Sequence, residues 1–352
     1  MAVEQVRGRG LTCFLDVAPT LSYGSRTRTE SVFPTEVVMQ RLSAATAALA
    51  LMVSVLVSAE PALAAESSPV GFAGMNGGTT GGAGGSTVTV STASALASAL
   101  SSGSTQTIRI SGMISISGMY RVASNKSILG VGSGSGLNGG GLTMNGVSNI
   151  IIRNLTIQNS SDDAINVQDG SHHIWIDHNN FTRASDGLVD IRLASDFITV
   201  SWNRFYGHDK TALLGSSDSN TGDVGHLRVT YVHNWFDGTN QRHPRVRFGN
   251  PVHVLNNYYS NIGSYGVAST TNAGVYVERN YFENVSRPTS LQEGSSPQGN
   301  IKLLNNYLVN SGTPLSRNAS SVATIPYSYT PECNCSVKST VTAGAGVGKI
   351  GL

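Results

Sequence analysis

The chain has 352 residues, of which 40 are glycine and only 12% are charged, whereas soluble domains average about 25% charged residues. Its apolar content of 39% can close a sizeable core, which excludes a disordered polymer, and its net charge of +2 argues against broad nucleic-acid binding. The three cysteines, Cys13, Cys333 and Cys335, are too few for a small fold stapled by disulfides.

The N-terminal region contains a segment with the features of a secretory signal peptide, at residues 39–65. It has a basic start, an apolar stretch from Leu42 to Ala59 and a small-residue cleavage site that ends at Ala65. The apolar stretch is close to the length of a membrane span, so a membrane anchor is the alternative. We expect export with cleavage, which leaves a secreted protein without membrane attachment.

The segments on either side of this signal differ from ordinary folded sequence. Signal peptides begin at the N-terminus, so residues 1–38 are interpreted as an extension or a misassigned start, with Met39 as a candidate true start. Residues 66–85 are rich in glycine and have no regular period, which predicts a flexible leader. The catalytic domain is therefore expected at residues 86–352.

A repeated phrase dominates the chain from residue 150 onward: alternating apolar residues, then Asn, then an aromatic residue two positions later. Successive asparagines are separated by 25, 24, 31, 22, 24 and 25 residues, a period that indicates a solenoid. Apolar alternation predicts strands, and a helical period is found at Ala93 to Leu100. We predict an all-β parallel β-helix with an internal Asn ladder and an insertion at Ser216 to Gly225. The asparagines assigned to the ladder are Asn154, Asn179, Asn203, Asn234, Asn256, Asn280 and Asn305.

The few charged side chains of the repeats recur at similar offsets from the ladder asparagines. Residues at equal offsets lie above one another, about 4.8 Å apart from coil to coil. This placement predicts an acidic cluster beside a basic one, and clustered carboxylates favour Ca²⁺, with solvated surface acids as the alternative. The residues concerned are Asp163, Asp186 and Asp190 on two coils, Lys210 on the next, and Arg242, Arg245 and Arg247 on the fourth.

The chain resembles the pectate lyases of polysaccharide lyase family 1. The resemblance rests on four phrases and covers roughly residues 86–352. It implies a right-handed parallel β-helix, secreted by a microbe, that cleaves polygalacturonate by β-elimination. The matching phrases are Asn125–Gly130, Trp175–His178, Asp186–Ile191 and Arg242–Gly249.

The resemblance also implies roles for individual residues. Arg242 takes the position of the base that abstracts a proton, and the calcium ligands would be Asp163, Asp186 and Asp190. Asp186 stands where some members have Glu, and Ser161 where some carry a further acid that Asp162 could replace. We expect Ca²⁺ as cofactor, a polygalacturonate partner, a monomer, and an alkaline pH optimum. The residues expected to bind substrate are Lys210, Arg245 and Arg247.

Three other functions fit the same fold. A pectin lyase would lack the acidic triplet, which this chain has. A polygalacturonase would need a general acid and an activated water, for which the adjacent Asp162 and Asp163 are suggestive. A non-catalytic cell-wall-binding β-helix would keep the ladder without needing Arg242, Lys210 and the acids in register.

Overall fold

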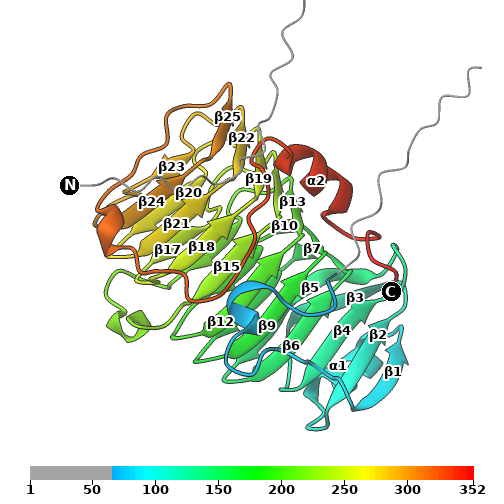
Figure 1. Ribbon diagram of the computed structural model, residues 1–352. Coiled ribbons are helices and arrows are strands. Elements are labelled where there is room, and N and C mark those ends of the chain that lie inside the picture. The colour runs from blue at the N-terminus through cyan, green and yellow to red at the C-terminus, as the bar shows by residue number, and fades with distance from the viewer. Residues whose placement is uncertain (1–65) are drawn as a thin grey trace, which may run out of the picture. The chain divides into compact units, whose positions relative to one another are not determined.

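The computed structural model describes residues 66–352; the predicted extension 1–38 and signal peptide 39–65 lie outside the described residues. All pairings between the named strands are parallel, and successive coils stack along one axis (Figure 1). The predicted right-handed parallel β-helix is confirmed. Among residues 66–352, no helix is long and apolar enough to span a bilayer.

Each complete coil contributes one strand to each of three rows. The first row is a sheet of ten strands in the described part of the chain, and its first strand begins at Ser86. Its members are β1 (Ser86–Val90), β2 (Gln106–Ile110), β4 (Lys126–Gly130), β6 (Ser148–Arg153), β9 (His172–Asp177), β12 (Asp196–Ser201), β15 (Val229–Val232), β18 (Val252–Leu255), β21 (Gly274–Glu278) and β24 (Asn300–Leu304).

The second row follows the first after a short turn in each coil. It starts at β5 (Gly136–Asn145), which also pairs with β3 (Met113–Arg121). Its other strands are β7 (Thr156–Ser160), β10 (Asn180–Ala184), β13 (Arg204–Tyr206), β16 (Trp235–Asp237), β19 (Tyr258–Ser260), β22 (Tyr281–Glu283) and β25 (Tyr307–Val309).

The third row branches from the far half of β5 and completes each coil. The repeat in the sequence also predicts a second short strand in each coil, at Ala164–Val167, Leu188–Ile191 and Ala212–Leu214, and strands are present at all three places. The strands are β8 (Ile165–Gln168), β11 (Val189–Ile191), β14 (Ala212–Leu214), β17 (Arg245–Arg247), β20 (Val267–Thr270) and β23 (Thr289–Ser290).

Two α-helices pack on the solenoid. The predicted helix is α1 (Ala93–Ser101), which is capped by Thr92 and buries Leu96 and Leu100 against the first coils. The helix α2 (Val337–Gly344) was not predicted, although Val337 and Val341 recur at helical spacing and pack on the outer face of the second row (Figure 1). The 3-10 turns are η1 (Gly71–Gly74), η2 (Thr221–Asp223) and η3 (Ala319–Ser321).

The Asn ladder exists, but three of its predicted members were assigned one residue too early. Asn257 and Asn306 occupy the ladder rather than Asn256 and Asn305, and Leu155 rather than Asn154 stands in register with Asn179. At each interior step one Nδ2 donates to the Oδ1 of the next asparagine, at 3.0 to 3.1 Å. Side chains alternate along a strand, so a shift by one residue exchanges the inner and outer face.

The corrected ladder explains the aromatic stack inside the coil. From Asn179 to Asn280, the residue two positions after the ladder asparagine points into the core, so Tyr259 is buried and Tyr258 faces α2. Neighbouring rings stack with centroids 4.4 to 5.2 Å apart, within the range of favourable aromatic pairs. The stacked rings are Phe181, Phe205, Phe236, Tyr259 and Phe282.

The glycine-rich segment 66–85 lies on the outer face of the first row (blue in Figure 1). Phe72 is fully buried, and its backbone N–H donates to Oγ1 of Thr230 at 3.1 Å. Gly71 leaves space for that hydroxyl, because a methyl group there would lie 2.4 Å from it. The prediction of a flexible leader therefore differs from the structure, where close backbone approach explains the glycines.

We expect Asn234→Ala to destabilise the protein by about 3 kcal/mol or more, because it leaves several buried polar groups without partners. Asn234 accepts hydrogen bonds from Asn203 and donates to Val200 and Asn257. The denaturant midpoint measures the effect, and Asn284→Ala, which removes an exposed amide pair, is the control. Equal midpoints for the two variants would contradict the stabilising role of the ladder.

Candidate functional site

The site is built on the third row, where alternate side chains point out of the coil. On β11, Val189 and Ile191 pack into the core, so Asp190 points outward. Strand register places Asn166, Asp190, Leu213 and Arg245 above one another on successive coils. One outward column therefore changes from amide to acid to apolar to cation along the solenoid.

The turns that enter the third row carry the second part of the site. The backbone N–H of Asp186 donates to the carbonyl of Asp162, which aligns the turns of these two coils. In the next two coils, the backbone of Lys210 forms an isolated parallel β-bridge with that of Gln241. The backbone N–H of Ala212 donates to the carbonyl of Arg242. Acids of two coils are therefore followed by cations of the next two.

Three carboxylates come together at this place. One oxygen from each of Asp162, Asp163 and Asp186 lies within 4.8 Å of the other two. Oxygens that bind one Ca²⁺ at about 2.3–2.6 Å can be at most about 5 Å apart, so this group has the right spacing and donor type. The donor set fits a calcium ion.

Asp190 adjoins this acidic cluster across Gly187. A methyl group at position 187 would lie 2.2 Å from Oδ1 of Asp190 and 3.0 Å from Oδ1 of Asp163. The two carboxylates therefore approach the same bare backbone atom. Asp163 is held by the Gly187 N–H at 2.8 Å and by Nδ2 of Asn166 at 2.9 Å.

Burial makes these acids hard to ionise without a cation. Burial, followed by the charge of Asp163, raises the pKa of Asp190 to about 8. Burial also raises the pKa of Asp163, although its bonds from Gly187 and Asn166 partly oppose the shift. A bound cation would relieve both penalties, which supports the assignment of a metal site.

We expect Gly187→Ala to raise the Kd for Ca²⁺ at least about tenfold, because the new methyl group displaces ligand carboxylates. Calorimetric titration measures this affinity. Gly134→Ala is the matched control, since nothing lies within 4 Å of a methyl group there. Equal affinities in the two variants would place the ion elsewhere.

The cations begin directly beside the acids. Lys210 Nζ lies 3.0 Å from Oδ1 of Asp186, in a pair whose side chains are 38% and 50% exposed. Arg242 has a left-handed backbone, with φ of 66°, and its charge acts on Asp190. Its Nε is buried and has no hydrogen-bond partner among the described residues. The Arg242 side chain is therefore close to the acids without being tied to them.

Arg245 and Arg247 share the outer face of β17. Arg245 Nη2 donates to the Glu293 carbonyl at 3.0 Å and to Ser296 Oγ at 2.8 Å. Burial, and then the charge of Arg247, lowers the pKa of Arg245. Arg247 pairs with Asp218 at 2.7 Å. Both arginines are thus fixed by loops outside the repeat.

The predicted site residues meet on one face, with an altered arrangement of acids. Asp163 and Asp186 belong to the close group that also contains Asp162, while Asp190 stands behind them beside Gly187. Sequence reasoning missed Asn166, although its register with Asp190 was readable from the repeat. It also missed Asp218, because residues of the insertion have no equivalent position in the other coils from which their place could be predicted.

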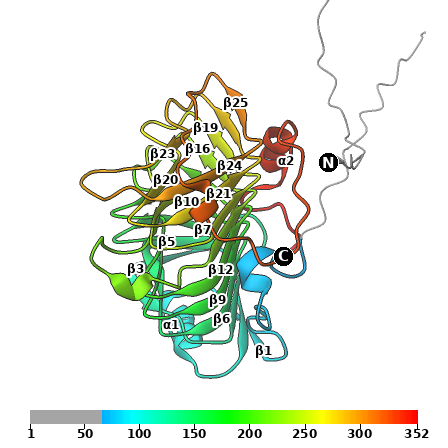
Figure 2. The ribbon, with the colours of Figure 1, turned by 60° about the vertical axis from the view of Figure 1, so that its left-hand side comes forward.

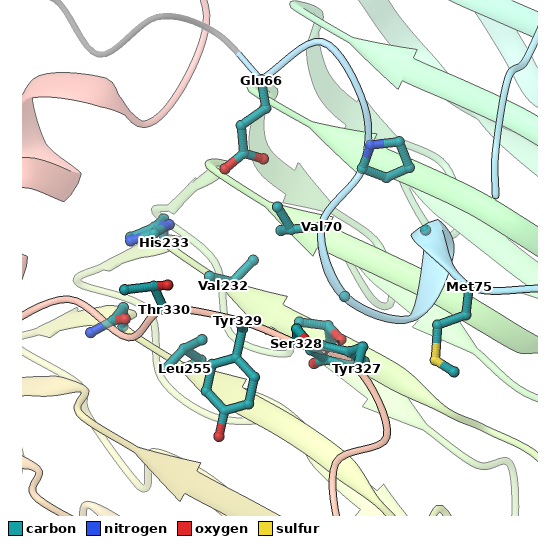
Figure 3. A pocket seen from close by; sticks show the side chains of 15 residues that line it. Glu66, Val70, Met75, Val232, His233, Leu255, Tyr327, Ser328, Tyr329 and Thr330 are labelled. Atoms are coloured by element: carbon teal, nitrogen blue, oxygen red, sulfur yellow. Dashed lines mark hydrogen bonds between the residues drawn. The ribbon is translucent and has the colours of Figure 1, made fainter.

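A cavity of about 310 Å³ lies elsewhere, on the outer face of the first row, and holds no predicted site residue. Figure 3 shows Glu66 and Val70 of the N-terminal segment facing Tyr327 and Tyr329 of the C-terminal segment. Burial, followed by the charge of Asp177, raises the pKa of Glu66. Figure 2 gives the side view of the same segments, blue and red, beside the first row. This cavity therefore lies between the N-terminal and C-terminal segments that cover the outer face of the first row.

Comparisons with known proteins agree with one another. A family model described as pectate lyase matches residues 39–350. A pectate trisaccharide-lyase of Bacillus licheniformis is 39% identical over 84% of this chain and 93% of its own, and a probable pectate lyase B of Aspergillus terreus is 44% identical over 63% and 70%. A pectate lyase of Bacillus sp. N165 in complex with trigalacturonate has a TM-score of 0.73 and 35% identity, covering 80% of this chain and 99% of that one.

Proposed function

The chain belongs to the pectate lyase family and is an enzyme of that family, and we propose that it cleaves α-1,4-polygalacturonate by calcium-dependent β-elimination. The observation that carries this proposal is the step from acidic to cationic side chains on adjacent coils. A polyanionic chain laid along this face would need a cation to approach the acids, and would meet fixed cations beyond them.

The calcium ion would be held by Asp163, Asp186 and Asp190, with Asp162 available at the same group. A calcium ion held by these residues would supply the positive charge that offsets the negative charge of a substrate carboxylate. Asn166 and the Gly187 N–H hold Asp163 in place. Lys210 forms an ion pair with Asp186 in this structure, and its Nζ would turn to a substrate carboxylate when substrate binds.

Arg242 is the proposed base. The hydrogen on C5 of galacturonate is acidic because it lies α to a carboxylate, and its loss builds negative charge on that group. The C5 proton passes to Arg242 in its neutral form, the C4–O bond breaks as the C4–C5 double bond forms, and a water molecule protonates the departing oxygen. The neighbouring cations Lys210, Arg245 and Arg247 would stabilise the developing anion.

Lys210, Arg245 and Arg247 are proposed to bind substrate carboxylates. Guanidinium groups bind carboxylates through two parallel N–H bonds, and Arg245 and Arg247 present theirs from one strand. We also propose that the protein is secreted and acts as a monomer on the polysaccharide. The relative named a pectate trisaccharide-lyase suggests trimeric products, which chromatography of a digest would identify.

The substrate is tested by comparing polygalacturonate with highly methyl-esterified pectin. Esterification removes the carboxylate charge, so we expect faster release of unsaturated uronate from polygalacturonate at alkaline pH. Faster cleavage of the esterified polymer would indicate a pectin lyase. New reducing ends without ultraviolet absorbance would indicate hydrolysis, and binding without cleavage would indicate a non-catalytic protein.

A further inference from the structure

One cation of the site is held by a carboxylate from outside the repeat. Arg247 Nε donates to Oδ1 of Asp218 at 2.7 Å, and Nη1 donates to the Gly215 carbonyl at 3.2 Å. A guanidinium has five N–H groups, so three remain, including both on Nη2. The Arg247 side chain is only 11% exposed, so the guanidinium is largely enclosed by the protein.

Asp218 is itself fixed by two other parts of the chain. Oγ1 of Thr271 donates to it at 2.7 Å, and Oγ of Ser296 contacts both carboxylate oxygens at 2.8 Å. Burial raises the pKa of Asp218, but the bonds from Thr271, Arg247 and Ser296 outweigh it and lower the pKa to about 2. The carboxylate is therefore charged at every working pH and cannot easily turn away.

The same serine connects the two arginines of β17. Ser296 Oγ accepts from Arg245 Nη2 at 2.8 Å and contacts Asp218, which in turn pairs with Arg247. The charge of Asp218 also opposes the lowering of the Arg245 pKa that burial and Arg247 produce. Asp218 thus allows two like charges to remain close together on one short strand.

We propose that Asp218 is a positioning residue that orients Arg247, and through Ser296 Arg245, to receive a substrate carboxylate. The inference rests on the proposed function, because it deepens the substrate-binding role of β17. A carboxylate that competed with the substrate would bind both Nη groups of Arg247. Asp218 instead accepts from Nε and leaves the N–H groups of Nη2 available to a substrate carboxylate. A long side chain fixed beforehand loses less rotamer entropy when substrate binds.

Steady-state kinetics on polygalacturonate test this role. We expect Asp218→Ala to raise KM about 5–20-fold with kcat changed less than about threefold, because ground-state binding is lost. Asp218→Asn keeps an oxygen acceptor for Arg247, so its KM should lie closer to that of the unmodified protein. Should Asp218→Ala fail to fold, the intermediate effect in Asp218→Asn still measures the contribution of the charge.

Asp223→Ala is the matched control within the same insertion. Asp223 anchors the loop through the Ala194 N–H at 2.7 Å but does not contact Arg247, so this change should lower Tm and leave KM nearly unchanged. The same KM increase in Asp223→Ala would show that Asp218 only holds the insertion in place and does not position Arg247. A lower KM in both Asp218 variants would make it a competitor. Absence of unsaturated product from the unmodified protein would instead contradict the proposed function.

Discussion

We expect the Arg242→Ala substitution to lower kcat on polygalacturonate by about 10²–10⁴-fold, the range expected when a general base is removed. The side chain is close enough for its charge to act on Asp190, and its buried Nε has no hydrogen-bond partner among the described residues. A substrate clamp would mainly raise KM, whereas a base would mainly lower kcat. Calcium affinity should not fall, because the change removes a cation beside a ligand carboxylate.

Arg183→Ala is the matched control for this change. Arg183 also has a left-handed backbone, with φ of 52° against 66° at Arg242, but its side chain bonds to exposed Asn159 and half-buried Gln158 on the second row. We expect kcat and KM of this control to remain close to those of the unmodified protein. A rise in KM with unchanged kcat in Arg242→Ala would make Arg242 a clamp and require another base.

We expect chelation of calcium to abolish activity and to destabilise the protein most at alkaline pH. Without the ion, Asp190 keeps its proton in the folded state up to a pKa of about 8, while the unfolded chain releases it near the ordinary aspartate pKa of 3.8. The folded state then binds more protons between these values, so stability falls as pH rises through them. Added calcium should therefore raise Tm more at pH 9 than at pH 5.

Asp190→Asn separates the two consequences of this buried acid. We expect it to weaken calcium binding and activity, yet to flatten the pH dependence of Tm in chelator, because the buried charge is gone. Asp169→Asn, which changes an exposed aspartate just after β8, is the control for both measurements. A Tm of chelated Asp190→Asn that still falls between pH 5 and pH 9 would contradict this explanation.

The solenoid was readable from the sequence because each coil repeats the same pattern, including strands as short as Ala212–Leu214. The spacing of the repeat does not identify the ladder residue where two asparagines are adjacent, as at Asn256 and Asn257. Their bonds decide it: Asn257 donates to Tyr231 and Asn280, while Asn256 bonds outward to Arg279.

The site was predictable as far as it follows the repeat. Offsets brought Asp163 and Asp186 to one place, but only the turn around Gly187 shows that Asp162 joins them and that Asp190 stands behind. Asp218 could not be predicted, because its contacts to Arg247 depend on how an insertion of no fixed period folds back. The arrangement of such a loop is set by tertiary contacts rather than by local spacing.

The most direct test of calcium-dependent elimination is the ultraviolet absorbance of unsaturated uronate released from polygalacturonate at alkaline pH. It should be followed with added calcium, with chelator, and after calcium is restored, using protein that begins near Ala65. We expect absorbance to rise with calcium, to stop with chelator and to resume on restoration. A rise that continues unchanged in chelator would contradict the calcium site, and cleavage without absorbance would contradict elimination itself.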